Sequence, residues 1–225
     1  MGFHKINLSK SVIVLDLDDT LYNELDYQIS GFKEVIKCLK DNYKIKTNYQ
    51  FIHKCIRQKK NILEELCKKY GLKKSIIKSL LWVYRLHKPR IYMKKNVKKS
   101  LNRLERMSSG VAILTDGRSI SQRLKLQALG ICHLPMYISE DYIDKKPSIK
   151  RFKLIMKDMP AKKYVYIGDN PLKDFLAPNK LKWLTIGIKG SKRNIYSQKI
   201  KKINKEYLPD FWVKDFLEIL DILKN

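Results

Sequence analysis

The sequence has 225 residues, of which 44% are hydrophobic and 31% are charged. This composition suits a soluble globular protein rather than a disordered one, and the length allows one large domain or a core domain with an insert. No apolar run approaches the ~20 residues that span a bilayer, and the first residues lack a signal-peptide pattern. The four cysteines have neither paired nor zinc-ligand spacing, so we expect reduced thiols in a cytoplasmic protein without a membrane partner.

The chain is strongly basic, with a formal net charge of +26 from 48 Lys and Arg against 22 Asp and Glu. Such a charge could attract nucleic acid, anionic lipid or a polyanionic small substrate. The lysines, however, are spread along the whole chain, and the basic segments 44–46, 94–99 and 199–205 contain no interleaved aromatic residues for base stacking. We interpret most of the charge as solvated surface. Nucleic acid is a possible partner, but the sequence does not favour it.

The first third of the chain contains one strand and then a long helical block. Residues 11–16 form a short β-branched run that predicts a buried parallel strand. From residue 23 to residue 93 the apolar residues recur at helical spacing, in the segments 27–43, 51–71 and 75–88. Gly71 is a plausible helix end. We therefore expect an all-helical insert over residues 23–93.

After this insert, helical and strand patterns alternate. Strands are predicted near 110–115, 135–140, 164–168, 182–188 and 210–213, separated by helices near 97–107, 119–129, 148–159 and 171–176, with a last helix at the C-terminus. Ser119 or Ser121 is the expected cap of the second helix, and Gly130 its end. Strands separated by helices indicate a Rossmann-like, doubly wound α/β core over residues 1–22 and 94–225, with a surface loop near 189–204.

Acidic residues follow three of the predicted strands. Asp16 and Asp18 follow the first strand, Asp116 follows the strand near 110–115, and Asp169 follows the strand near 164–168, with Asp174 five residues beyond it. Ligands of open parallel sheets bind beyond the carboxyl ends of the strands, so these residues should meet in one site. Several carboxylates repel one another unless a cation neutralises them, and ligands that are all oxygens favour Mg²⁺.

These residues belong to four ordered motifs, Asp16-x-Asp18-Asp19-Thr20-Leu21, Thr115, Lys146-Pro147 and Gly168-Asp169-Asn170-x3-Asp174. In order and spacing they resemble the motifs of the haloacid dehalogenase-like superfamily. The resemblance covers residues 8–22 and 94–225, whereas the insert matches the helical cap of that superfamily by position and class only.

The resemblance implies a covalent mechanism. Asp16 would attack phosphorus and form an aspartyl-phosphate, while Asp18 would act as the general acid and then as the general base. Mg²⁺ would be held by Asp16, the backbone carbonyl of Asp18, and Asp169. Asp18 also favours phosphoryl transfer over carbon–halogen cleavage, because the metal-free dehalogenases lack an acid at this position.

The resemblance also implies substrate-binding and supporting residues. Thr115 and the following amides would bind the phosphoryl oxygens, and Lys146 would balance the developing negative charge, with Lys145 as the alternative. Arg118 would contact a second anionic group or face solvent. The full set expected to bind substrate is Thr115, Asp116, Gly117, Arg118 and Lys146. The supporting residues are Thr20, Asn170 and Asp174, of which Asn170 is an alternative metal ligand.

We therefore expect a Mg²⁺-dependent phosphohydrolase that cleaves a small soluble phosphate monoester, with a sugar phosphate as the candidate substrate. One alternative is a phosphomutase of the same superfamily, which would share every catalytic residue. The other is a nucleotide or polynucleotide-end phosphatase, which the basic charge would suit. Neither the oligomeric state nor the physiological substrate follows from the sequence.

Overall fold

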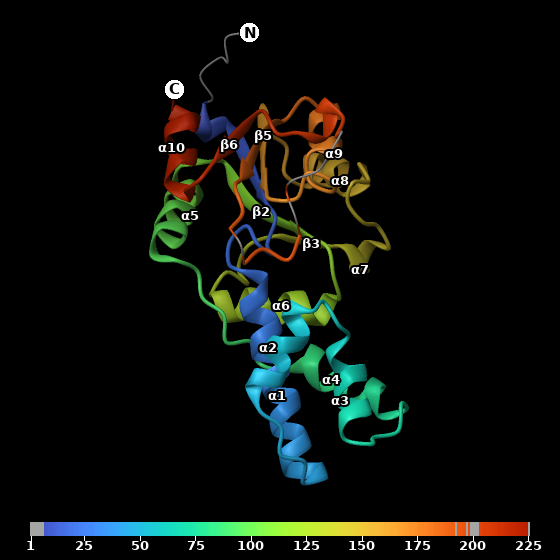
Figure 1. Cartoon of the computed structure of the whole chain (residues 1–225). Helices are drawn as coiled ribbons and strands as arrows, with labels where there is room; N and C mark the ends of the chain where they lie inside the picture. Colours follow the sequence, from blue (N-terminus) through green and yellow to red (C-terminus); the bar gives the residue numbers. More distant parts are fainter. Residues whose placement is uncertain (1–6, 192, 197, 199–202, 225) are drawn as a thin grey trace. The chain divides into compact units, whose positions relative to one another are not determined.

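The structure is a computed structural model that describes residues 7–191, 193–196, 198 and 203–224 (Figure 1). The chain divides into two compact units. Met1–Leu25 and Tyr92–Asn225 form the core unit, and Asp26–Ile91 form the helical unit. These bounds lie within three residues of the predicted insert at 23–93.

A parallel six-stranded sheet forms the centre of the core unit, as the alternating sequence pattern predicts. Its strand order is β3-β2-β1-β4-β5-β6, and every pair of neighbours runs parallel. The strands are β1 (Ser11–Leu15), β2 (Gly110–Thr115), β3 (Met136–Ile138), β4 (Lys163–Gly168), β5 (Leu184–Ile188) and β6 (Phe211–Val213). All five residues of β1 are buried, because this strand lies between two neighbours and is covered on both faces.

Helices cover both faces of the sheet, which confirms the doubly wound α/β prediction. On one face, Val12 and Val14 of β1 pack in a cluster with Phe152 and Trp183, near α8 and α9. On the other face, α5 packs against α10 (Figure 1). The helices of the core unit are α5 (Lys95–Met107), α6 (Ser119–Leu129), α7 (Ser139–Tyr142), α8 (Lys150–Asp158), α9 (Leu176–Lys180) and α10 (Phe216–Lys224), with 3₁₀ turns η1 (Leu8–Lys10) and η2 (Lys205–Tyr207).

The start of α6 differs from the prediction. Neither Ser119 nor Ser121 is its N-cap residue; that position is Arg118, whose side chain makes no capping bond. Instead, the backbone N–H of Ser119 donates to Glu140 Oε2 at 2.8 Å. The carboxylate of Glu140 in α7 therefore accepts one of the backbone N–H groups left without a partner at the start of α6. The two residues are far apart in the sequence, so no local pattern predicts this contact. The end of α6 is as predicted, with Gly130 in the left-handed conformation.

Two other elements begin or end away from their predicted positions. The strand predicted over 135–140 ends at Ile138, and the chain then turns into α7. The helix predicted near 171–176 begins only at Leu176, because residues 171–175 form turns. The predicted loop over 189–204 contains no helix or strand in its described part, while residues 199–202 of the basic segment 199–205 lie outside the described residues.

The helical unit contains helices and no strand among its described residues. Its helices are α1 (Glu24–Tyr43), which begins in the core unit, α2 (Tyr49–Arg57), α3 (Ile62–Lys69) and α4 (Ile76–Leu86). The helical pattern over 51–71 is divided at 58–61, where the Asn61 side chain caps α3 by accepting a bond from Glu64 N. A core that includes Phe32, Leu39 and Leu66 holds the helices together. None of the described helices has the length and apolar character that crossing a membrane requires.

Candidate active site

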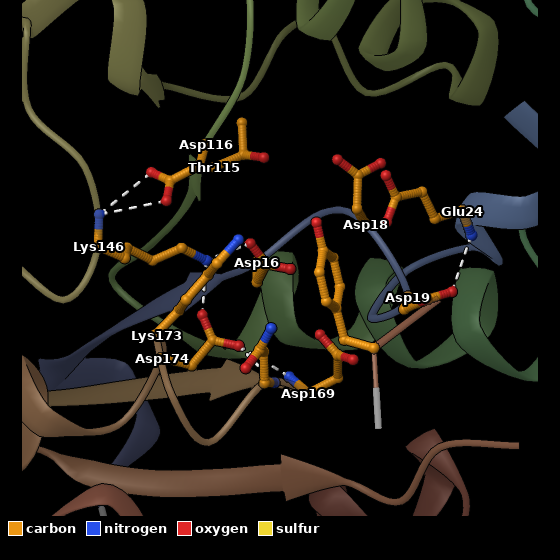
Figure 2. Close-up of a pocket in the computed structure, with 12 residues that line it drawn as sticks. Asp16, Asp18, Asp19, Glu24, Thr115, Asp116, Lys146, Asp169, Lys173 and Asp174 are labelled. Atoms are coloured by element: carbon orange, nitrogen blue, oxygen red, sulfur yellow. Dashed lines mark hydrogen bonds and ion pairs between the residues drawn. The ribbon is translucent and has the colours of Figure 1, made fainter. Parts of the chain in front are cut away.

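Three neighbouring strands end at the same edge of the sheet, and each is followed or ended by a residue of the predicted site. Leu15 of β1 lies beside Ile113 of β2 and Ile167 of β4, so Asp16, Thr115 and Asp169 emerge close together. They line a pocket of about 100 Å³ (Figure 2). Its lining residues are Asp16, Asp18, Asp19, Glu24, Thr115, Asp116, Lys146, Asp169, Asn170, Lys173, Asp174 and Tyr196.

Lys146 connects two of the buried acids. Its Nζ lies 2.5 Å from Asp16 Oδ1 and 2.6 Å from Asp174 Oδ1, and the side chain extends toward Asp16 (Figure 2). Burial alone would lower the pKa of Lys146, but Asp16 and Asp174 raise it well above its ordinary value. The lysine is therefore a fixed positive charge beside the predicted nucleophile.

The carboxylate of Asp174 accepts four hydrogen bonds. Its Oδ2 accepts the backbone N–H groups of Asp169 at 3.1 Å and Asn170 at 2.7 Å, and its Oδ1 accepts bonds from Lys146 and from the Tyr166 hydroxyl at 3.0 Å. Gly168 makes this approach feasible, because a Cβ at that position would lie 2.6 Å from Asp174 Oδ2. With both oxygens engaged, Asp174 fits a supporting role that orients other groups.

The acids fit a divalent cation. Carboxylate oxygens of Asp16, Asp169 and Asp174 lie within 4.8 Å of one another. Burial, and then the charges of Asp174 and Asp16, raise the pKa of Asp169 to about 9, and burial raises that of Asp16 to about 7 despite Lys146. A hard cation with oxygen ligands would relieve this repulsion, so the donor set suits Mg²⁺.

The two remaining supporting residues contact the acids or the turn beside them. Thr20 Oγ1 lies 3.4 Å from Asp16 Oδ2 and donates to it. Asn170 Oδ1 accepts the backbone N–H of Leu172 at 3.1 Å, so this side chain shapes the turn after β4.

The carboxylate of Asp18 is bound by α6, a contact that the sequence did not suggest. Lys125 Nζ lies 2.7 Å and 2.9 Å from its two oxygens, Gln122 Nε2 donates to Oδ2 at 3.2 Å, and the Tyr22 hydroxyl donates to Oδ1. Burial would raise the pKa of Asp18, but Lys125 and the other donors lower it.

A second buried network lies behind Asp116. Arg151 Nη2 lies 2.5 Å from Asp116 Oδ1, and Arg151 Nε lies 3.3 Å from Asp144 Oδ2. The same guanidinium donates to the carbonyl oxygens of Thr115 at 2.9 Å and Tyr137 at 3.0 Å. Arg151 is only 1% exposed. It was not among the predicted site residues, although a charged residue on the apolar face of a predicted helix was a signal that could have found it.

The structure places Arg118 and Gly117 outside the pocket that the other predicted substrate ligands line. Arg118 Nη1 lies 2.5 Å from Glu140 Oε1, and its side chain is 59% exposed. Together with Gly117 and Lys145 it lines a second, more open hollow of about 600 Å³, which does not include the acids of the pocket.

The wall of the pocket contains further residues that the sequence did not single out. Lys173 lies with its Nζ 4.8 Å from the centre of the Tyr196 ring. Next to Tyr196, the backbone N–H of Ile195 donates to Asp19 Oδ2 at 3.0 Å, which fixes the loop after β5 beside the pocket. Burial and the nearby Asp18 raise the pKa of Glu24 to about 8.

A family model for haloacid dehalogenase-like hydrolases matches residues 13–188 of the chain. The chain belongs to this family. The predicted resemblance is thereby confirmed for most of the chain, including the segment that contains all four motifs.

Relatives of this haloacid dehalogenase-like hydrolase support the same assignment. A glyceraldehyde 3-phosphate phosphatase from Methanocaldococcus jannaschii is 27% identical over 231 residues, covering 95% of this chain and 96% of that protein. Two solved structures share the fold over their whole length. YfnB from Bacillus subtilis, assigned as a hydrolase of this family and solved with magnesium, has a TM-score of 0.64 at 16% identity, covering 96% of this chain and 100% of its own. A protein from Haemophilus somnus assigned as a phosphoglycolate phosphatase has a TM-score of 0.62 at 22% identity, covering 98% and 99%. The expectation of a phosphatase of this family is confirmed.

Proposed function

We propose that this phosphatase hydrolyses a small phosphate monoester in the presence of Mg²⁺, through an aspartyl-phosphate on Asp16. The observation that carries the proposal is the convergence of Asp16, Lys146 and Asp169 on one pocket at the carboxyl edge of the sheet. A nucleophile, a fixed cation and a further carboxylate that could bind a metal ion, all in one small space, are what phosphoryl transfer to a carboxylate needs.

The first half-reaction is phosphoryl transfer to Asp16. A carboxylate oxygen of Asp16 bonds to phosphorus, the bond from phosphorus to the ester oxygen breaks, and the proton of the Asp18 carboxyl passes to the leaving oxygen. Thr115, at the end of β2, and Lys146 bind the transferred oxygens and offset their charge.

The second half-reaction returns the enzyme to its starting state. The Asp18 carboxylate takes a proton from water as the water oxygen bonds to phosphorus, and the bond to Asp16 breaks. Asp16, Asp169 and the backbone carbonyl of Asp18 would hold Mg²⁺, which supplies the positive charge that lets an anionic nucleophile approach an anionic phosphoryl group. Asp174 keeps Lys146 in place through the 2.6 Å contact.

The pocket is large enough for the phosphoryl group of a substrate. About 100 Å³ holds a phosphoryl group and little more, so the rest of the substrate must be recognised by other residues. We propose that the helical unit acts as the cap that selects it. A phosphorylated short sugar or sugar aldehyde is the first substrate class to test, because the relative from Methanocaldococcus jannaschii is a glyceraldehyde 3-phosphate phosphatase.

A phosphate-release screen tests the proposal directly. Wild type and Asp16→Asn are assayed side by side with Mg²⁺ against sugar phosphates, triose phosphates, nucleotides and 4-nitrophenyl phosphate. The proposal expects Mg²⁺-dependent phosphate release by the wild type alone. Absence of release from every compound would contradict it.

A phosphomutase remains the second candidate, because a protein from Thermotoga maritima assigned as a beta-phosphoglucomutase has the same fold, with a TM-score of 0.65. A mutase would convert one sugar phosphate into another without free phosphate. The polynucleotide alternative rests on the charge of +26. It predicts oligonucleotide binding with a steep salt dependence, and an unchanged electrophoretic mobility of oligonucleotides at low salt would exclude it.

A further inference from the structure

Helix α6 presents two buried polar side chains to Asp18. Lys125 is 4% exposed and Gln122 is 3% exposed, although both are residue types that normally lie at the surface. Burying an ammonium group is costly unless an anion lies beside it. Lys125 meets that condition, because its Nζ lies within 2.9 Å of both oxygens of the Asp18 carboxylate.

Gln122 connects Asp18 to the turn after β2. Its Nε2 donates to Asp18 Oδ2 at 3.2 Å and to the backbone carbonyl of Asp116 at 2.9 Å. The amide lies directly under Gly117, where an added Cβ would lie 2.3 Å from Gln122 Nε2. Any side chain at position 117 would therefore displace Gln122, so the glycine and the amide form one tightly packed unit.

We infer that Lys125 and Gln122 are positioning residues for Asp18. An aspartate side chain can rotate about two bonds, and only a narrow range of these rotations brings its carboxyl group to the leaving oxygen of the substrate. Lys125 contacts both oxygens of the ionised carboxylate, and Gln122 ties one of them to the turn that follows Thr115. When Asp18 takes up the proton that it donates, one oxygen exchanges its contact with Lys125 for one with the leaving oxygen, while the remaining contacts keep the carboxyl group in place. This inference rests on the proposed function, in which Asp18 donates a proton to the leaving group.

The inference predicts a dependence on the leaving group. 4-Nitrophenolate leaves readily without a proton, whereas the alkoxide of benzyl phosphate needs one in the transition state. The ratio kcat/KM reports the steps up to phosphoryl transfer and excludes the later attack of water. A displaced Asp18 should therefore lower kcat/KM for benzyl phosphate by about 100-fold, and that for 4-nitrophenyl phosphate by only about threefold.

The test compares Lys125→Met, Lys125→Arg and Gln122→Leu with wild type on these two substrates at saturating Mg²⁺. Lys125→Arg keeps the charge and should recover part of the loss. Gln122→Leu should lower kcat/KM for benzyl phosphate by about tenfold. Because this variant leaves no unpaired charge in the core, it still tests the inference if Lys125→Met does not fold. Arg123→Met is the matched control on the same helix, because Arg123 pairs with Asp141 on the exposed side.

The outcomes separate this inference from the proposed function. A wild type that hydrolyses neither ester and releases phosphate from no compound of the screen contradicts the proposed function. A wild type active on both, with variants that lose the same factor on both, overturns the inference and indicates a merely structural role for α6. A wild type active on 4-nitrophenyl phosphate alone has no effective general acid, and that result also overturns the inference.

Discussion

Lys146 lies with its ammonium nitrogen 2.5 Å from a carboxylate oxygen of Asp16, and both side chains are almost completely buried. They are 130 positions apart in the sequence and meet because the loop before α8 returns to the end of β1. This pair sets the charge at the point where a phosphoryl group would bind. Without Lys146, Asp16 would face Asp174 and Asp169 with no cation between them.

Replacing Lys146 should remove activity, whereas replacing its neighbour should not. Lys146→Met leaves no fixed cation at Asp16, so we expect kcat/KM for 4-nitrophenyl phosphate to fall by at least about 100-fold. Lys145 is exposed and lines the separate hollow, and Lys145→Met is therefore the matched control. Steady-state kinetics measure kcat/KM for both variants. An equal fall in kcat/KM for Lys146→Met and Lys145→Met would refute the assignment of Lys146.

Arg151 should stabilise the folded core through Asp116. Removing one partner of a buried ion pair leaves the other charge unpaired, so Arg151→Met should lower the free energy of unfolding by about 3 kcal/mol. Arg151→Met leaves both Asp116 and Asp144 without this cation, and Asp116→Asn removes one of these two charges. The double variant should therefore lose about 1 to 2 kcal/mol less than the sum of the single variants. Urea unfolding of all four proteins measures this coupling, and additive losses would show that the contact contributes nothing.

The metal-free protein should become less stable as the pH rises. Asp16 and Asp169 have pKa values of about 7 and about 9 in the folded protein, against an ordinary value of 3.8. Between about pH 4 and about pH 9 the folded state therefore binds more protons than the unfolded state, and the free energy of unfolding falls across this range. Mg²⁺ competes with these protons, so its stabilising effect should grow with pH.

Urea unfolding at about pH 5 and about pH 8.5, with EDTA or with Mg²⁺, checks this sign. Asp169→Asn is the control, because it removes the carboxyl group whose pKa is raised more. In EDTA, the free energy of unfolding of this variant should therefore depend less on pH than that of the wild type. The prediction fails if the difference between wild type and Asp169→Asn does not change with pH.

Much of the fold and of the acid cluster was predictable, because both have local signals. The β-branched run 11–16 and the acids that follow it indicate a buried strand with a site at its carboxyl end. Asp16, Thr115 and Asp169 lie where this reasoning places them. The strand order was not predictable, because it depends on which distant strands pair and not on the pattern within any one of them.

Lys125 and Arg151, which bind acids of the site, were not predicted, because their contacts also depend on residues that are far apart in the sequence. Lys125 and Asp18 are 107 positions apart, and Arg151 and Asp116 are 35 apart. Only folding shows that each cation has an acidic partner. A weak signal existed in both cases, since each cation lies on the apolar face of its helix, beside Leu126 or Phe152. Buried cations at helical spacing are worth searching for in such sequences.

The central claim is that Asp16 is transiently phosphorylated, and mass spectrometry tests it most directly. The proposed mechanism makes Asp18 the base that activates water, and Asp18→Asn would lack this base. After mixing of this variant with 4-nitrophenyl phosphate and Mg²⁺ and quenching in acid, the peptide with Asp16 should gain one phosphoryl group. Asp16→Asn should show neither the added mass nor turnover. A variant Asp16→Asn that keeps more than about a tenth of wild-type activity, together with no phosphorylated peptide in Asp18→Asn, would contradict the covalent mechanism.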